Sequence, residues 1–360
     1  MTVATLGAGP RVTVDLGAVA GNTRTLAARA RGELMAVVKA DGFGHGALGV
    51  ARAALGAGAA WLGVTGLGEA LDLRANGLTA PILSWLNPLG TDFEAAVRHR
   101  VDLAVPSLTH LAALPPGARV HLQLDTGMAR EGASLSEWAA LCRAAFTAER
   151  GGRLVVAGIM SHLAGPETAA ATRRFRDGIA VAFAAGLRPR LCHLAATAAT
   201  LTRPETHFDL VRTGAGLVGI DPSGGTSLRG AMTLTAPVVE VRRVAAGTPV
   251  GYDHTWRAAR DTHLALLPLG YADGLPRGAG PRAEVLLGGR RCRVAGRISM
   301  DQTVVETGPE VRPGDTATVF GPGDDGEPTI ADWAAWAGTL PHEIVTGLGA
   351  RPHRHVIGGN

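Results

Sequence analysis

Short apolar runs alternate with longer amphipathic stretches through the first two thirds of the chain, about eight times over roughly 200 residues. Parallel strands need a crossover, usually a helix, so this alternation predicts an α/β fold with a parallel sheet. A closed (β/α)8 barrel fits this number of units better than an open sheet. No GxGxxG motif follows the first apolar run, which argues against dinucleotide binding. The apolar runs are Val12–Val14, Leu34–Val38, Trp61–Val64, Pro81–Leu83, Val101–Ala104, Val120–Leu124, Val155–Ile159, Leu191–Leu194 and Leu210–Val211, and helix-like stretches include Gly17–Ala30, Leu135–Glu149 and Pro166–Ala185.

The pattern changes after about residue 230, where short alternating strands and Gly or Pro turns replace the strand–helix repeat. We therefore expect a barrel domain over residues 1–230 and a mostly β C-terminal domain over residues 231–360. Within the second domain, Ile330–Ala337 and Pro341–Leu348 are expected to form short helices.

Composition excludes several classes of protein. Hydrophobic residues make up 46% of the chain and charged residues 18%, which argues against disorder. The net charge of +4 is spread among acidic residues, so no nucleic-acid surface is expected. No apolar run is long enough to cross a membrane, and the start Met1–Val3 lacks a secretory pattern. Three separated cysteines indicate free thiols in a cytoplasmic protein and suggest no zinc site, so we expect no metal ion.

Lysine is nearly absent: Lys39 is the single lysine among 35 basic side chains. Arginine does not lose its proton in a protein, whereas an amine can do so and attack a carbonyl. Lys39 directly follows an apolar run, which places it at the carboxyl end of a barrel strand, the catalytic face of such barrels. The alternative is a lysine whose ammonium group reaches solvent from a strand end.

The segment Ala36–Gly46, AVVKADGFGHG, resembles the pyridoxal-phosphate lysine motif of alanine racemases. Further motifs of that family follow in order over almost the full chain. They are Asp125–Arg130, Ser161–His162, His193–Ala195, Val211–Gly214, Val250–Tyr252, Leu269–Gly274 and Gly296–Gln302.

This resemblance implies racemisation, which needs an electron sink and a base on each face of the substrate α-carbon. Pyridoxal 5'-phosphate (PLP) supplies the sink in the family. The resemblance implies that Lys39 is the base for D-alanine and Tyr252 the base for L-alanine. In the family, this tyrosine enters the site of the partner subunit. We therefore expect a homodimer with shared sites that provides D-alanine for peptidoglycan.

Other site residues follow partly from the resemblance and partly from barrel geometry. In the family, an arginine matching Arg212 points at the pyridine nitrogen, and a histidine matching His162 continues the contact. Phosphate often binds after the seventh and eighth barrel strands, which here points to Thr197, Gly214 and Ala215. The resemblance further implies that Arg130, Tyr271 and Met300 contact the substrate.

Four positions depart from the family pattern. Phe43 replaces a tyrosine whose hydroxyl reaches the phosphate, and Ala350 replaces a tyrosine near the C-terminus. Gln123 replaces a lysine that many members carry as a carbamate, and Ala196 stands where an asparagine is usual. These changes leave substrate choice open.

Three alternatives to alanine racemisation remain at this point. The first is a racemase for serine or for many amino acids, in a specialised biosynthetic pathway. The second is a PLP-binding protein without catalysis. The third is a metal-dependent barrel hydrolase that uses His162 and His193.

Overall fold

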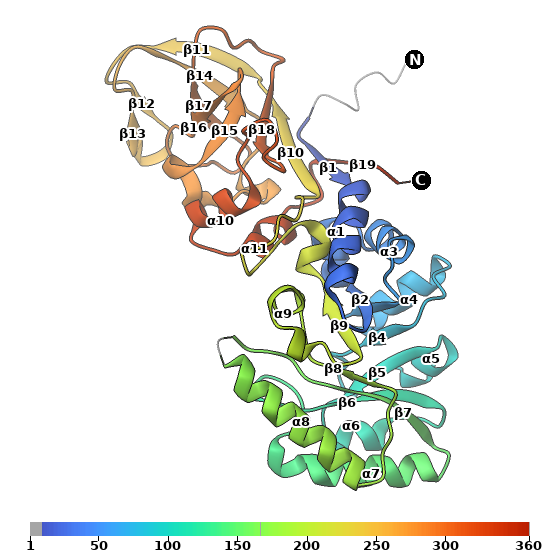
Figure 1. The fold of residues 1–360 in the computed structure, drawn as a ribbon. Helices are drawn as coiled ribbons and strands as arrows, with labels where there is room; N and C mark the ends of the chain where they lie inside the picture. Colours follow the sequence, from blue (N-terminus) through green and yellow to red (C-terminus); the bar gives the residue numbers. More distant parts are fainter. Residues whose placement is uncertain (1–8, 166, 360) are drawn as a thin grey trace, which may run out of the picture.

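The protein forms two lobes in a computed structural model, which describes residues 9–165 and 167–359. A barrel with its helices forms one lobe, and a mostly β domain forms the other (Figure 1). Met1–Val3 and Pro166, on which two of the expectations above rest, lie outside the described residues.

Eight parallel strands form a nearly closed barrel, as the alternation predicts. Their order in the sheet is β8-β7-β6-β5-β4-β3-β2-β9. Backbone bonds from Asp209 N to Cys192 O (3.0 Å) and from Arg212 N to Ala195 O (2.9 Å) bridge β8 and β9. The strands are β2 (Glu33–Val37), β3 (Trp61–Val64), β4 (Ile82–Ser84), β5 (Val101–Val105), β6 (Ala118–Gln123), β7 (Leu154–Met160), β8 (Leu191–His193) and β9 (Leu210–Thr213).

A helix follows each of the first seven barrel strands, and a 3₁₀ turn at Ala215–Val218 follows the eighth. Side chains cap several helices: Ser134 and Glu137 form a reciprocal capping box at the start of α7. The buried faces of these helices cover the apolar strands. The helices are α1 (Leu16–Arg29), α2 (Lys39–Gly44), α3 (Ala47–Gly56), α4 (Leu67–Ala75), α5 (Phe93–Arg98), α6 (Leu108–Ala113), α7 (Leu135–Arg150), α8 (Thr168–Ala184) and α9 (Thr197–Thr202).

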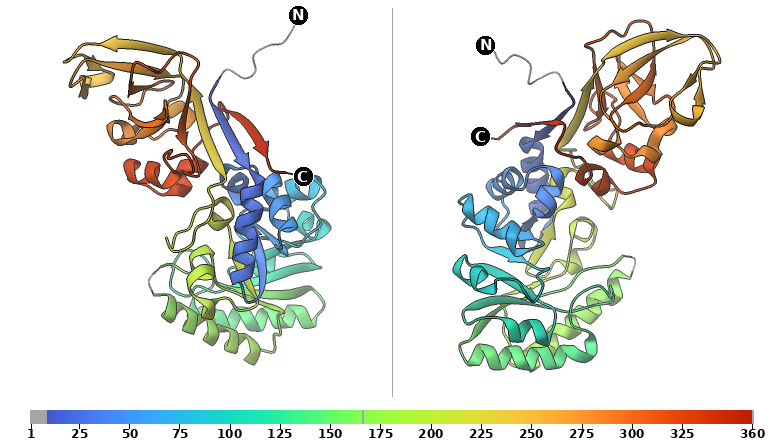
Figure 2. Two further views of the ribbon diagram at one scale, coloured as in Figure 1. Left: turned by 45° about the horizontal axis from the view of Figure 1, so that its top comes forward. Right: turned by 180° about the vertical axis from the view of Figure 1, so that it is seen from behind.

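The first apolar run, Val12–Val14, does not join the barrel, so its expected place in the strand–helix alternation is wrong. Its strand, β1 (Arg11–Asp15), lies between β10 and β19 in a six-stranded sheet of the second lobe. Alternate side chains of β1 are buried, which is the pattern of a strand in a sheet with one covered face. Figure 2 shows β1 and β19 side by side, near the two chain ends.

The second lobe contains three antiparallel or mixed sheets and two helices. The six-stranded sheet has the order β16-β15-β18-β10-β1-β19, and a three-stranded sheet has the order β11-β14-β17. The elements are β10 (Met232–Pro237), β11 (Glu240–Val244), β12 (Pro249–Val250), β13 (Trp256–Arg257), β14 (Thr262–Leu267), β15 (Glu284–Leu287), β16 (Arg290–Arg293), β17 (Thr303–Thr307), β18 (Thr316–Phe320), α10 (Ile330–Ala337), α11 (Pro341–Thr346) and β19 (His353–Ile357).

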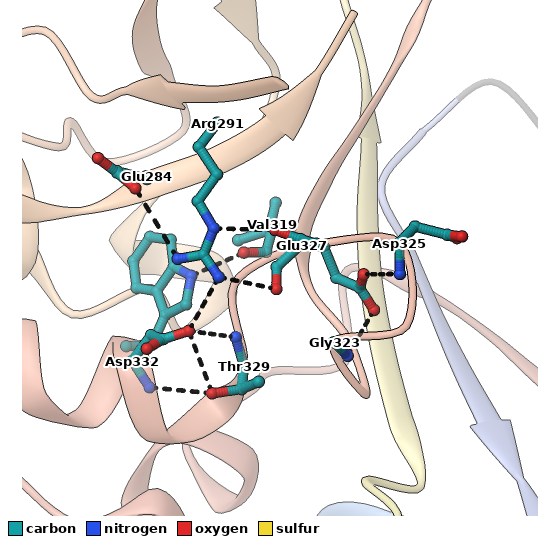
Figure 3. A network of polar contacts seen from close by, with 10 residues as sticks. Glu284, Arg291, Val319, Gly323, Asp325, Glu327, Thr329 and Asp332 are labelled. Carbon is teal, nitrogen blue, oxygen red and sulfur yellow. Dashed lines mark hydrogen bonds and ion pairs between the residues drawn. The ribbon is translucent and has the colours of Figure 1, made fainter. Parts of the chain in front are cut away.

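A polar network fastens the loop between β18 and α10 (Figure 3). The buried Glu327 carboxylate accepts bonds from the backbone N–H groups of Gly323 (2.7 Å) and Asp325 (2.9 Å). Arg291 donates to the carbonyl of Glu327 (3.1 Å) and pairs with Asp332 (3.4 Å) at the start of α10. This loop is therefore held from both sides before the chain reaches α11.

None of the helices in the described part of the chain is long and apolar enough to cross a membrane.

Cys142, Cys192 and Cys292 are buried free thiols. Burial raises the pKa of Cys142 and of Cys192 to about 12, so neither thiol is reactive at neutral pH.

Candidate functional site

A pocket of about 410 Å³ opens where the barrel strands end, beside α11 of the second lobe. Three cationic side chains line it, Lys39, Arg130 and Arg212, with one carboxylate, that of Glu131. This excess of positive charge favours an anionic ligand. The remaining lining residues are Val37, Phe43, Trp85, Met160, His162, Leu163, Ala196, Thr197, Ala198, Gly214, Ala215, Pro222 and His342.

Lys39 follows the carboxyl end of β2, separated from it by Val38, as expected, and its side chain is half-buried. Its Nζ atom lies 6.0 Å from the ring centroid of Trp85. Burial and then the positive charge of Arg130 lower the pKa of Lys39 below its usual value. The neutral amine, the form that acts as a base or nucleophile, is therefore easier to reach here than on an exposed lysine.

A left-handed helical turn follows Lys39. The φ angles of Ala40, Asp41, Gly42 and Phe43 lie between 52° and 62°. Left-handed backbone costs roughly 1 kcal/mol or more for each residue other than glycine, so surrounding contacts must hold it. Asp41 Oδ1 accepts from Ala47 N (2.8 Å), and the turn carries the Phe43 ring inward against Gly214.

Arg212 lies in β9, and its guanidinium is buried in the site. It donates to Ser161 O (2.6 Å), to His193 Nδ1 (2.9 Å) and to His162 Nδ1 (3.2 Å). Burial lowers the pKa of Arg212 to about 10, so it stays charged at neutral pH. Burial, and then the cations Arg212, Arg130 and Lys39, lower the pKa of His162 to about 3, so His162 is neutral.

A chain of buried polar groups continues from Arg212 into the barrel. His193 Nε2 lies 2.8 Å from His121 Nδ1, and His121 Nε2 lies 3.3 Å from Asp102 Oδ2. Arg212 can only donate, so His193 Nδ1 accepts and its proton is on Nε2. The same reasoning places the His121 proton on Nε2, facing the Asp102 carboxylate.

The loops after β8 and β9 form a cradle, which consists of Thr197, Gly214 and Ala215. Thr197 Oγ1 accepts from Gly216 N (3.2 Å), which joins the two loops. An added Cβ at Gly214 would lie 2.6 Å from a Phe43 ring carbon, so only glycine leaves this space open. In the described part of the chain, the backbone N–H groups of Gly214 and Ala215 have no hydrogen-bond acceptor. They remain available to an anion.

Arg130 lines the pocket from the loop after β6 and pairs with Glu131 (2.8 Å). The Asp125 carboxylate shapes this loop by accepting from the N–H groups of Gly127 (2.8 Å) and Met128 (2.9 Å). Gln123 is buried, and its Oε1 has no partner among the described residues. No bond between Gln123 and Arg130 is therefore present.

Tyr252, Tyr271 and Met300 do not line the pocket of their own chain. Their side chains are 65%, 40% and 54% exposed, respectively. The backbone N–H of Tyr271 donates to Ser299 O (3.0 Å), and Arg297 pairs with Asp253 next to Tyr252. These bonds gather the three side chains on neighbouring loops of the second lobe.

Strained backbone holds the Tyr252 turn. Gly251 has a φ of 71°, and Asp253 and His254 have φ values of 59° and 50°. Only the glycine adopts this region without cost, so the ion pair between Asp253 and Arg297 helps to hold the turn. The side chain of Tyr252 is thereby presented to solvent.

The sequence did not point to Trp85, Glu131 and His342 as pocket residues, and it missed the roles of Asp102 and His121. A signal existed for Asp102, because it is the one polar residue in an otherwise apolar barrel strand. His121 carried a weaker signal, because Arg119 and Gln123 share its strand. A buried polar group in such a strand needs a partner. No comparable signal marks His342, which comes from the other lobe.

Comparisons with known proteins agree with this architecture. Residues 14–222 match the family model described as alanine racemase, N-terminal domain, and residues 231–356 match that of the C-terminal domain. An alanine racemase of Frankia casuarinae is 49% identical, over 95% of this chain and 95% of that protein.

Solved structures show the same similarity. The alanine racemase from D-cycloserine-producing Streptomyces lavendulae aligns with a TM-score of 0.95 and 43% identity, covering 99% of each chain. The alanine racemase from Bartonella henselae, solved with covalently bound pyridoxal phosphate, aligns with a TM-score of 0.86 and 28% identity. That alignment covers 97% of this chain and 100% of the other.

Proposed function

The chain belongs to the alanine racemase family, and from this premise we propose that it interconverts L-alanine and D-alanine with PLP as cofactor. The observation that carries the proposal is the position of Lys39: a half-buried amine of lowered pKa in a cationic pocket at the barrel mouth. Its place in the cell would be the cytoplasm, supplying D-alanine for peptidoglycan.

The residues of the pocket fit PLP. The free N–H groups of Gly214 and Ala215, together with Thr197, would hold the phosphate. Arg212 would donate to the pyridine nitrogen, and the Lys39 amine would hold the aldehyde carbon. When bound, the cofactor would supply a conjugated ring that withdraws electrons and stabilises negative charge at the substrate α-carbon.

Two bases on opposite faces of the α-carbon would carry out the exchange. Lys39 would take or return the proton on the D face. Tyr252 of the partner subunit would do so on the L face. Removal of a proton by a neutral amine is consistent with the lowered pKa of Lys39.

Arg212 would control how far negative charge spreads. A guanidinium that stays charged can only donate a hydrogen bond, so the pyridine nitrogen would stay unprotonated. The α-carbon would then keep more of the negative charge and be reprotonated promptly. This would limit side reactions such as transamination.

Substrate contacts would come from both subunits. Arg130 would bind the substrate carboxylate, because a forked cation suits that group. The exposed Tyr271 and Met300 of the partner would close the entrance. The exposure of Tyr252, Tyr271 and Met300 in one chain supports a homodimer with shared sites.

A subunit-mixing experiment tests the shared site. The variants Lys39→Ala and Tyr252→Phe should each lack racemisation. When equal amounts are dissociated and reassembled together, one site of each mixed dimer is intact, and about a quarter of the wild-type activity should return. No recovery, with mixed dimers demonstrated, would contradict the exchange of Tyr252 between subunits.

A chiral product assay separates alanine from other substrates. The purified protein is incubated with L-alanine, L-serine and bulkier L-amino acids, and the D-products are measured. Faster turnover of L-serine than of L-alanine would contradict the proposal that alanine is the substrate.

The contacts of the two histidines speak against a hydrolytic metal site. His162 and His193 both direct Nδ1 at the Arg212 guanidinium, whose charge repels a metal ion. Among the described residues, no cluster of three or more His, Cys, Asp or Glu side chains could hold one. Retained racemase activity after chelation would agree with this.

A further inference from the structure

A second pocket, of about 370 Å³, lies at the face of the barrel opposite to the pocket of Lys39. It is lined where the barrel strands begin, and we call it the amino-end pocket. Its volume lies in the range of small-molecule sites, roughly 300–1000 Å³. The reaction proposed above uses only the carboxyl ends of the strands, so it does not account for this pocket. The residues that define it are Trp61, Arg74, Arg100, Asp102, Arg119 and Arg190.

The amino-end pocket carries an excess of positive charge. Four arginines line it, whereas Asp102 supplies the one carboxylate among its described lining residues. That carboxylate is buried and already accepts hydrogen bonds from Arg119 (3.1 Å) and His121 (3.3 Å). The charge that remains is positive and favours an anionic ligand.

Three of the arginines have N–H groups to offer. The guanidinium of Arg100 has no acceptor in residues 9–165 and 167–359, although its backbone carbonyl accepts from Arg74. Within the same residues, Arg119 donates only from Nε, to Asp102, and Arg190 only from Nη1, to Glu33 (2.8 Å). The fork of N–H groups on a guanidinium matches the paired oxygens of a carboxylate or a phosphate.

Arg74 holds the wall of the pocket. It donates to the carbonyls of Leu78 (2.7 Å), Ala80 (2.7 Å), His99 (2.9 Å) and Arg100 (3.0 Å). These bonds join the loop after α4 to the loop after α5. Burial, and then the positive charge of Arg100, lower the pKa of Arg74. The two like charges therefore repel each other, and an anion bound beside them would offset that repulsion.

Arg100 occupies its position at a cost to the backbone. Its φ angle is 51°, and its N–H closes the end of α5 on Val97 O (3.1 Å). Glycine commonly ends a helix in this left-handed conformation, which costs roughly 1 kcal/mol or more for another residue. An arginine with an unpaired guanidinium at a strained position is consistent with a binding role.

We propose that the amino-end pocket binds a small anion with two or more negative charges, carried by carboxylate or phosphate groups. Arg100, Arg119 and Arg190 hold its oxygens, and the apolar lining, which includes Trp61 and Pro81, suits an organic anion. The site does not depend on the proposed racemase chemistry, because none of its described lining residues also lines the pocket of Lys39.

Calorimetric titration of the protein saturated with PLP tests the site. Citrate and inorganic phosphate are the probes, and acetate is the singly charged comparison. The better of the two probes should bind at least about tenfold more tightly than acetate, and added salt should weaken it. Tighter binding of citrate would identify a polycarboxylate ligand, and tighter binding of phosphate a phosphate compound. Equal affinities for all three anions, or no binding, would overturn the proposal.

Two variants locate the bound anion. Arg100→Gly removes the guanidinium at a φ angle that glycine adopts freely, so the fold should be kept, while the affinity should fall about tenfold. Arg98→Gln is the matched control, because it removes the same charge two residues away, where Arg98 pairs with Asp92 outside the pocket. Its affinity should stay within about twofold of wild type. Equal losses in the two variants would mean that net charge alone attracts the anion, which contradicts a site here.

A third variant keeps the test decisive if Arg100→Gly folds poorly. Arg190 has an exposed side chain, so Arg190→Gln should fold and should also weaken binding of the anion. Unchanged affinity in both Arg100→Gly and Arg190→Gln would refute the site. Borohydride reduction and peptide mapping check separately that the cofactor is on Lys39. If it is not, the proposed function fails, while the three variants still test the amino-end pocket.

Discussion

Arg212 Nη1 donates to His193 Nδ1 across 2.9 Å, and this contact sets the tautomer of both histidines beneath it. Because a guanidinium has no acceptor, His193 Nδ1 must accept this hydrogen bond. The proton of His193 is then on Nε2, from which it donates to His121. This series of hydrogen-bonded side chains ends at the Asp102 carboxylate, which accepts from His121 and pairs with Arg119 (3.1 Å). Arg212, the cationic end of this series, lines the pocket, and Asp102, its anionic end, is buried in the barrel.

Two substitutions of His193 separate its contact with Arg212 from its contact with His121. His193→Leu leaves the Arg212 donor without this acceptor, and it should lower the free energy of unfolding by about 1–3 kcal/mol relative to His193→Asn. Asparagine keeps an oxygen near the position of Nδ1. Urea unfolding of both variants checks this, and equal stabilities would contradict it.

His45 should make the stability depend on pH. Its Nδ1 donates to Phe43 O (2.8 Å), while its Nε2 is buried without a partner among the described residues. Burial lowers the pKa of His45 to about 4, against 6.5 for an unperturbed histidine. Between these values the unfolded chain binds a proton that the folded chain does not.

The sign of the effect follows from this difference. The free energy of unfolding should fall as the pH drops from 6.5 toward 4, by about 1.4 kcal/mol per pH unit from His45 alone. Above pH 6.5 the residue contributes no slope. His45→Asn keeps an N–H donor but does not titrate, so its stability should fall less steeply. Identical slopes for wild type and variant in urea unfolding at several pH values would refute this.

Gly214→Ala should impair the phosphate cradle. Its Cβ would lie 2.6 Å from a Phe43 ring carbon and 3.2 Å from Val37 Cβ, so the ring or the loop must move. We expect PLP affinity to fall at least about tenfold. The double variant Gly214→Ala/Phe43→Leu relieves the collision and should bind PLP more tightly than Gly214→Ala. A fluorescence titration measures both, and an unchanged affinity of the single variant would show that the cradle tolerates the methyl group.

Glu327 should stabilise the second lobe without affecting the pocket chemistry. Its two carboxylate oxygens accept from Gly323 N and Asp325 N (Figure 3). Glu327→Ala removes both acceptors and should cost about 2 kcal/mol, while Glu327→Gln keeps one oxygen and should cost about half as much. Thermal unfolding checks the order of the three proteins. Equal melting temperatures would mean that water replaces the carboxylate at no cost.

The sequence predicts the barrel well because strand and helix periods differ and each unit repeats. Lys39 could be found from its position after a strand and its uniqueness, and Gly214 from its place after the eighth strand. Strand β1 was misassigned because an apolar run of three residues carries no information about which sheet it joins.

The rest of the site depends on contacts between residues far apart in the chain. His193 and His121 are distant in sequence, and the neighbouring positions of β8, β7 and β6 in the sheet bring His193 Nε2 to 2.8 Å from His121 Nδ1. A register irregularity between β6 and β7, with Gly158 facing His121, makes space for that ring. His342 reaches Phe43 only because the second lobe packs on the barrel mouth. None of these contacts leaves a local pattern in the sequence.

The pairing of β1 has a consequence for biosynthesis. This strand is synthesised before the barrel strands, but its two neighbours, β10 and β19, follow them and begin at Met232 and His353. The barrel sequence is complete well before β19 emerges, so Arg11–Asp15 must wait without its final partners while the barrel folds. The six-stranded sheet can therefore be completed only after His353–Ile357 has been synthesised, well after the last barrel strand.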